Sequence, residues 1–219
     1  LPNPDGSFTC TLFWPFAGTV GFDSVQTGAD MRRVCAEQFP DADRLMPDLE
    51  HEYEHNPTSS LVTMRTGPWH HDGRALLLGD AAHAIVPFLG QGANASLEDV
   101  TILMDLYEAH GHDAHAEVFE AFSHERKPQV DALADLAIEH YEEMRADVAS
   151  RVFLFGKLLE RFLARVFPSR FVPLYTMISF TRTPYADAAA RAKRQQEIAW
   201  ASVGLLALVV LAIVVLLVL

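Results

Sequence analysis

The chain has 219 residues, enough for one sizeable domain or two small ones with a core large enough to fold. Its formal net charge of −12 argues against a nucleic-acid partner, which would require clustered positive charge. The two cysteines, Cys10 and Cys35, are too few for a disulfide framework and predict buried or free thiols in a reducing compartment.

The first part of the chain predicts strands separated by short helices. Residues 8–16 are rich in aromatic and β-branched side chains and predict a strand, whereas 28–39 predict a short amphipathic helix. Residues 40–60 are rich in Pro and Asp, which favours loops with some helix, and 59–69 predict a second strand. Because strand-like sequence begins almost at the first residue, we expect the chain to be the back part of a longer protein.

A turn at Asp72–Gly73 and a short buried strand at 75–78 lead to the segment "GDAAHAIVPFLGQGANASLEDV", residues 79–100. A helix is expected from Gly92 onward, because apolar side chains then repeat at helical spacing. This predicted apolar stripe consists of Ala93, Leu97, Val100, Leu103, and Leu106 or Tyr107.

The residue types in this segment suit a flat ligand that carries hydroxyl groups. Asp80 follows a strand, at the edge where α/β folds bind ligands, and its carboxylate can accept hydrogen bonds from sugar hydroxyls. Gly90 and Gly92 let the backbone approach a ring closely, and the free N–H groups at a helix start favour negative charge. A flavin fits both features. The glycine spacing alone fits an ordinary strand-to-helix turn equally well.

The other polar residues near this segment have simpler interpretations. We interpret Glu98 and Asp99 as charges of the first helical turn at the surface, with Glu98 alternatively holding the loop. His83 is expected to be a hydrogen-bonded structural histidine. His51 and His55 are four residues apart, but no further ligand has matching spacing, so we predict no metal site.

Long helices are predicted to follow, over 114–150 with an interruption near Pro128 and over 152–166. Residues 168–186 contain three prolines and are expected to be irregular or short-helical, which leaves Tyr175 free to turn inward. The alternative for Tyr175 is a core tyrosine whose hydroxyl bonds to a backbone carbonyl. His140 lies on an apolar stripe of the first helix, which suits either a hydrogen-bonded core histidine or a substrate contact. The stripe is Leu133, Leu136 or Ala137, His140, Met144 and Val148.

Residues 198–219 carry no charge and, as a helix about 33 Å long, would cross a bilayer core of about 30 Å. The alternative is a buried core helix. Arg191, Lys193 and Arg194 precede this segment and Trp200 stands at its start, which predicts a single-pass anchor with the folded part facing the cytoplasm.

The string at 79–100 resembles the Gly-Asp motif of the single-component FAD-dependent aromatic-ring hydroxylases, and most closely of the members that hydroxylate kynurenine. The resemblance continues in "SFTCTLFWPF", "FSHERKPQVDALADLA", "YEEMRADV" and "PSRFVPLYTMISFTRTPY", in the family's order, and is weakest over 17–60. It implies the C-terminal portion of such an enzyme, because the family's G-x-G-x-x-G fingerprint is absent here.

The resemblance implies an α/β fold with a helical C-terminal region and one C-terminal transmembrane helix. The corresponding division is 1–66 for the end of the substrate-binding sheet region, 67–112 for the last part of the FAD-binding domain, 113–197 for the helical region and 198–219 for the membrane helix. It also implies FAD as cofactor, NADPH and O2 as co-substrates, and hydroxylation of an aromatic amino acid, L-kynurenine to 3-hydroxykynurenine. This segment alone is expected to be inactive. The alternatives are another membrane-anchored flavin hydroxylase, or a non-catalytic tail-anchored protein with a flavin-type fold.

The resemblance also assigns site residues. The family has Met where this chain has Ala93, and Asn where it has His140, and the family tyrosine matching Tyr175 binds the substrate carboxylate. The expected cofactor contacts are Gly79, Asp80, Pro87, Gly90, Gln91, Gly92, Ala93 and Asn94. The expected substrate contacts are Phe88, His140, Met144 and Tyr175.

Overall fold

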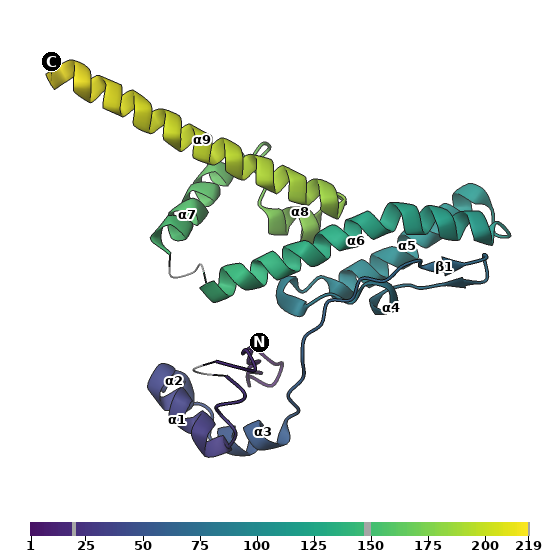
Figure 1. Cartoon of the computed structure of the whole chain (residues 1–219), viewed down its shortest axis with the longest axis horizontal. Coiled ribbons are helices and arrows are strands. Elements are labelled where there is room, and N and C mark those ends of the chain that lie inside the picture. Colours follow the sequence, from purple (N-terminus) through teal and green to yellow (C-terminus); the bar gives the residue numbers. More distant parts are fainter. Residues whose placement is uncertain (19–20, 147–149, 219) are drawn as a thin grey trace. The chain divides into compact units, whose positions relative to one another are not determined.

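The computed structural model describes residues 1–18, 21–146 and 150–218 (Figure 1). The chain divides into two compact units, Leu1–Ser60 and Leu61–Leu219. The described residues are mostly helical.

The first unit contains the short helices α1 (Gly28–Gln38), α2 (Pro40–Asp43) and α3 (Leu49–His55). Thr27 starts α1, because its Oγ1 accepts a hydrogen bond of 3.1 Å from the backbone N–H of Asp30. The core of this unit is small and includes the buried Cys35, whereas Cys10 is exposed, and both thiols are free. The predicted helix at 28–39 and the helical pieces within 40–60 are confirmed.

The strand predicted at 8–16 is wrong. An isolated bridge between Pro2 and Phe8 is the backbone pairing that this segment makes, and Phe8 is 73% exposed. A strand is stable only when a neighbour completes its hydrogen-bond ladder and covers one face. No strand among the described residues lies beside this segment to do so.

The second unit begins with a small hairpin. β1 (His70–His71) pairs antiparallel with β2 (Ala75–Leu76), so the predicted turn at Asp72–Gly73 is confirmed, with positive φ at both residues. The strand predicted at 59–69 is wrong, and the one at 75–78 is reduced to β2. Within the described ranges this hairpin is the one sheet, so the expected α/β architecture is present here only through its helices.

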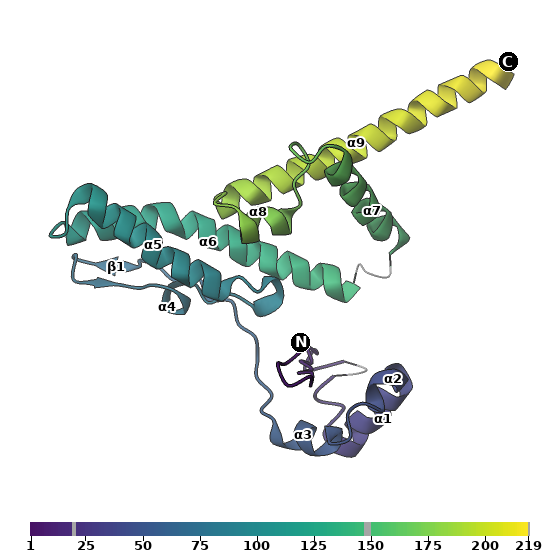
Figure 2. The ribbon, with the colours of Figure 1, turned by 180° about the vertical axis from the view of Figure 1, so that it is seen from behind.

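The helices of the second unit pack around α6 and α9 (Figures 1 and 2). The long α6 contacts both α5 and α9, and α8 packs on α9. Two apolar clusters fill the contacts, one centred on Phe122 and Val118 and the other on Leu133 and Met177. The helices are α4 (Asp80–His83), the 3-10 turn η1 (Pro87–Leu89), α5 (Gly92–His110), α6 (His115–Ala146), α7 (Arg151–Val166), α8 (Leu174–Phe180) and α9 (Tyr185–Val218).

The interruption predicted near Pro128 is wrong, because this residue lies inside the continuous, 32-residue helix α6. A proline inside a helix loses one backbone hydrogen bond and crowds the preceding turn. Here the turns on both sides are fixed by packing, since Phe122 and Val130 are fully buried. Tertiary contacts therefore hold the helix together where local propensity would break it.

The apolar stripe predicted for α5 has the right period but the wrong phase. Leu97 and Val100 are 69% and 51% exposed. The buried side of the helix instead carries Ala95, Asp99 and Leu106. The buried face therefore has a charged residue at its centre, which is why the apolar side chains alone predict the wrong face.

The C-terminal elements agree with the prediction. The helix over 152–166 appears as α7, and Pro173 directly precedes the short α8. By length and composition α9 is apolar enough to cross a membrane, and its apolar window is 0% buried within this chain.

Gly73 provides a test of how the hairpin is fixed against α6. An added Cβ would lie 2.8 Å from the backbone nitrogen of Ala116, at a φ of +62°. Gly90 has a nearly equal φ of +65° but no atom within 4 Å of an added Cβ. We expect Gly73→Ala to lower the free energy of unfolding by about 1–3 kcal/mol more than Gly90→Ala, because only Gly73 adds a steric clash to the backbone strain. Urea denaturation of the two variants measures this difference, and equal losses would contradict it.

Candidate functional site

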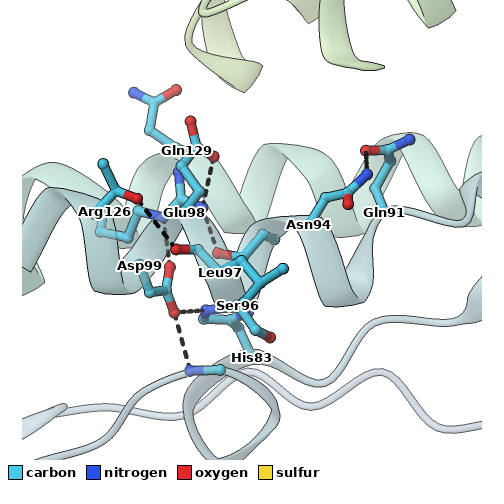
Figure 3. A network of polar contacts seen from close by, with 12 residues as sticks. His83, Gln91, Asn94, Ser96, Leu97, Glu98, Asp99, Arg126 and Gln129 are labelled. Carbon is cyan, nitrogen blue, oxygen red and sulfur yellow. Dashed lines mark hydrogen bonds and ion pairs between the residues drawn. The ribbon is translucent and has the colours of Figure 1, made fainter. Parts of the chain in front are cut away.

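The centre of the second unit is the side chain of Asp99, which is completely buried (Figure 3). Its Oδ2 accepts hydrogen bonds from the backbone N–H of Gly79 at 2.9 Å and from Nε2 of His83 at 2.7 Å. Its Oδ1 accepts one from Nε of Arg126 at 2.7 Å. One carboxylate on α5 thus joins the loop after β2, helix α4 and helix α6.

The charges in this network compensate for their burial. Burial raises the pKa of Asp99, but the hydrogen bonds from His83, Arg126 and Gly79 outweigh this effect and leave the pKa below its usual value. Burial lowers the pKa of Arg126. The hydrogen bond to Asp99 and the negative charge of Glu98 outweigh this effect, so the pKa of Arg126 is raised above its usual value. The pair therefore stays ionised inside the protein.

Arg126 extends the network toward the start of α9. Its Nη2 donates to the carbonyl of Ala95 at 3.0 Å and forms an ion pair of 2.9 Å with Glu98. Its guanidinium lies 5.2 Å from the ring centre of Tyr185. Burial and a hydrogen bond to Glu98 raise the pKa of Tyr185 to about 12, so its phenol stays neutral at physiological pH.

The network corrects one sequence prediction and agrees with another. The interpretation of Asp99 as a surface charge is wrong. His83 is 4% exposed and hydrogen-bonded, as expected for a structural histidine. Asp99 stands four residues after Ala95 and seven before Leu106, on the same helix face, and that spacing was the signal in the sequence that indicated its burial.

The same network fixes the backbone directly before Asp80. Gly79 is buried with a φ of +56°, and an added Cβ would lie 3.0 Å from Oγ of Ser96, so this position requires glycine. Asp80 begins α4 and is exposed, and its carboxylate forms no hydrogen bond or ion pair with the part of the chain that the structure describes. The backbone before Asp80 is thus fixed, and the carboxylate is open to a ligand.

The loop that leads into α5 is fastened from its own side. Gln91 is 4% exposed; its Nε2 donates to Oγ of Ser179 on α8 at 2.9 Å, and its Oε1 accepts from Nδ2 of Asn94 at 3.0 Å. No side chain caps the first turn of α5, so its backbone N–H groups are available to a ligand. An added Cβ at Gly90 or Gly92 would meet no atom within 4 Å, which leaves this side of the loop open.

A cavity of about 500 Å³ lies between this loop, α6, α7 and α8, and α7 contributes Lys157, Glu160, Arg161 and Ala164 to its wall. Its wall includes Leu89, which directly precedes the loop Gly90–Gly92, here called the glycine loop. It also includes His140 of α6 and Tyr175 of α8. The His140 side chain is 39% exposed, and Tyr175 is 55% exposed. The alternatives of a buried core histidine and a buried core tyrosine are therefore wrong.

The other two expected substrate residues lie outside this wall. Met144 is 43% exposed and does not line the cavity. Phe88 is half-buried and stacks on Tyr141 with ring centres 4.5 Å apart. Val148, the last residue of the predicted stripe, lies outside the described residues.

Comparison with known proteins finds similarity to a family of FAD-binding proteins and to kynurenine 3-monooxygenases. Residues 31–137 match the model of a family described as FAD binding domain. The chain is 46% identical to kynurenine 3-monooxygenase of Dictyostelium discoideum over 199 residues, covering 86% of this chain and 43% of that protein. It is 43% identical to the enzyme of Flavobacterium psychrophilum and 46% identical to that of Salinispora arenicola, covering 90% of this chain in both cases and 44% and 43% of those proteins. The chain thus spans less than half the length of these relatives.

Removing the central carboxylate tests the network. Asp99→Ala leaves Arg126 buried without its main partner, and we expect the free energy of unfolding to fall by about 3–5 kcal/mol. Asp105→Ala on the same helix is the matched control, because Asp105 is exposed. Urea denaturation measures both variants, and equal small losses would contradict the central role of Asp99.

The pH dependence gives a second measurement of the same contribution. Because the folded pKa of Asp99 is lowered, its stabilisation is complete above the unfolded pKa of about 3.9 and is lost as the pH falls through the folded value. In Asp99→Asn this part of the acid-induced loss should be missing. An unchanged acid profile would contradict the lowered pKa.

Proposed function

We propose that this chain is part of an FAD-dependent hydroxylase similar to the kynurenine 3-monooxygenases, and that it is the portion that holds one side of FAD and closes the substrate site. FAD is the family's cofactor, and NADPH and O2 are the co-substrates of this enzyme class. The proposal is supported most by the cavity in whose wall Leu89, His140 and Tyr175 meet.

The residues around the glycine loop fit FAD. The exposed carboxylate of Asp80 would accept hydrogen bonds from hydroxyl groups of the cofactor, and the uncapped N–H groups of α5, at Gly92, Ala93 and Asn94, would face a carbonyl edge. The positive end of the α5 dipole favours negative charge at that edge. Pro87, Gly90 and Gln91 complete the loop, Gln91 by holding it to α8 rather than by contact through its own amide.

When bound, the flavin supplies the chemistry: electrons from NADPH and the activation of O2 for transfer of one oxygen atom to an aromatic ring. The residues of this chain position the ring and exclude water. The hydroxyl of Tyr175 would donate a hydrogen bond to the carboxylate of L-kynurenine, and His140 would hydrogen-bond its amino-acid end. The product of this reaction would be 3-hydroxykynurenine.

The membrane part of the proposal concerns α9. Arg191, Lys193 and Arg194 precede the uncharged segment, so the positive-inside tendency would place the folded part on the cytoplasmic side. A single-pass anchor of this kind would keep the hydroxylase at a membrane surface.

Flavin retention tests the cofactor role of Asp80. In the whole hydroxylase, Asp80→Ala removes a charged hydrogen-bond acceptor, and we expect FAD affinity to fall by about 1.5–3 kcal/mol, about ten- to a hundredfold. Flavin absorbance after desalting measures the loss, with Asp105→Ala as the control. Wild-type retention in Asp80→Ala would contradict the assignment.

Kinetics of the whole enzyme test the substrate role of the cavity. Tyr175→Phe removes one hydrogen bond, worth about 0.5–1.5 kcal/mol, so the KM for kynurenine should rise several-fold while FAD content stays constant. His140→Asn restores the residue that the family carries and should keep or improve turnover. If His140→Asn abolishes turnover while FAD stays bound, the cavity serves a substrate other than kynurenine.

A further inference from the structure

Helix α7 presents an apolar face that no described part of the chain covers. Phe155, Leu158, Phe162 and Val166 are 48%, 59%, 60% and 48% exposed. They follow one another at helical spacing and form one stripe, the outer face of α7. The opposite side of the helix, including Phe153 and Leu163, lines a separate cavity of about 830 Å³ toward α6 and α9.

The outer face lies next to the candidate membrane span. Helix α7 contacts α9, and both views show the two helices crossing (Figures 1 and 2). The ring of Phe155 lies 6.1 Å from that of Trp200, and an added Cβ at Gly156 would lie 3.4 Å from Trp200. Trp200 stands near the start of the uncharged segment of α9, at the depth where a tryptophan of a spanning helix meets the lipid headgroups.

The charge around α7 has the sign that anionic lipids attract. Residues 151–194 contain nine Lys or Arg and two acidic residues, whereas the rest of the chain contains eight basic and 27 acidic residues. Arg151, Arg161 and Arg165 lie on α7 itself. A basic amphipathic helix with aromatic and aliphatic side chains on one face is the pattern of helices that lie in the membrane interface.

We infer that α7 lies in the interface of an anionic bilayer, with its outer face in the acyl boundary, while α9 crosses the membrane beside it. With 16 residues α7 is about 24 Å long, too short to span a hydrocarbon core of about 30 Å. The inference rests on the membrane anchor proposed for α9 and adds a second, in-plane contact to it. The rest of a longer hydroxylase and a second copy of the chain are the competing occupants of this face.

Depth-dependent quenching tests the inference in the whole hydroxylase, reconstituted into phosphatidylcholine vesicles that contain phosphatidylserine with brominated acyl chains. Phe162→Trp places a reporter on the outer face, and Leu97→Trp places a matched one on α5, where Leu97 is 69% exposed. Trp14, Trp69 and Trp200 give the same background in both variants. We expect brominated lipid to quench the added emission at 162 several-fold more strongly than that at 97.

Flotation of the vesicles separates the two proposals. If the chain floats with the vesicles while position 162 is no more quenched than position 97, protein covers the outer face and the inference is overturned, but the anchor stands. If the chain does not float, both are overturned. Arg151→Gln with Arg165→Gln should weaken quenching at 162 in anionic vesicles, and an unchanged signal would overturn the electrostatic part. Far-UV circular dichroism establishes that each variant is folded.

Discussion

The ionised Asp99–Arg126 pair is the constraint on which the second unit depends. It lies on two helices that pack on one another, and its remaining hydrogen-bonding capacity is used by Gly79, His83 and the carbonyl of Ala95. A buried pair of this kind adds little net stability, because removing both charges from water costs nearly what their attraction returns. Its effect is geometric, since any other register of α5 against α6 would leave a buried charge without a partner.

The candidate site follows from that register. The carboxylate of Asp99 holds Gly79, and therefore sets where Asp80 leaves the hairpin. The amide of Gln91 holds the next loop to α8 through Ser179, and therefore sets the distance between the glycine loop and Tyr175. Leu89 and Tyr175 thus meet in one cavity wall because the buried amide of Gln91, and not the loop alone, holds the loop to α8.

The sequence predicted the helices well and the strands poorly, for a physical reason. Helical hydrogen bonds are local, so periodicity was enough to predict α7, and the prolines at 173 and 184 indicated that residues 168–186 would be irregular or short-helical. Strands need partners that are distant in sequence, and residues 8–16 have none among the described residues. The predicted apolar stripe of α5 has the wrong phase because Asp99, a charged residue, lies on the buried face. His140 is not a core residue because the apolar stripe of α6 becomes exposed toward the end of this helix.

Helices α5 and α7 both expose apolar side chains, but the two faces do not suit the same kind of binding partner. The exposed side of α5 carries Leu97, Val100 and Met104, but this helix also exposes Asp105 and Glu108 and contains no Lys or Arg. An anionic bilayer would repel those charges, so this face suits a protein surface. Helix α7 has four basic residues and one acidic residue around the same kind of apolar stripe. The charge around each face therefore distinguishes the two: the face of α5 is compatible with protein packing, and that of α7 is compatible with lipid.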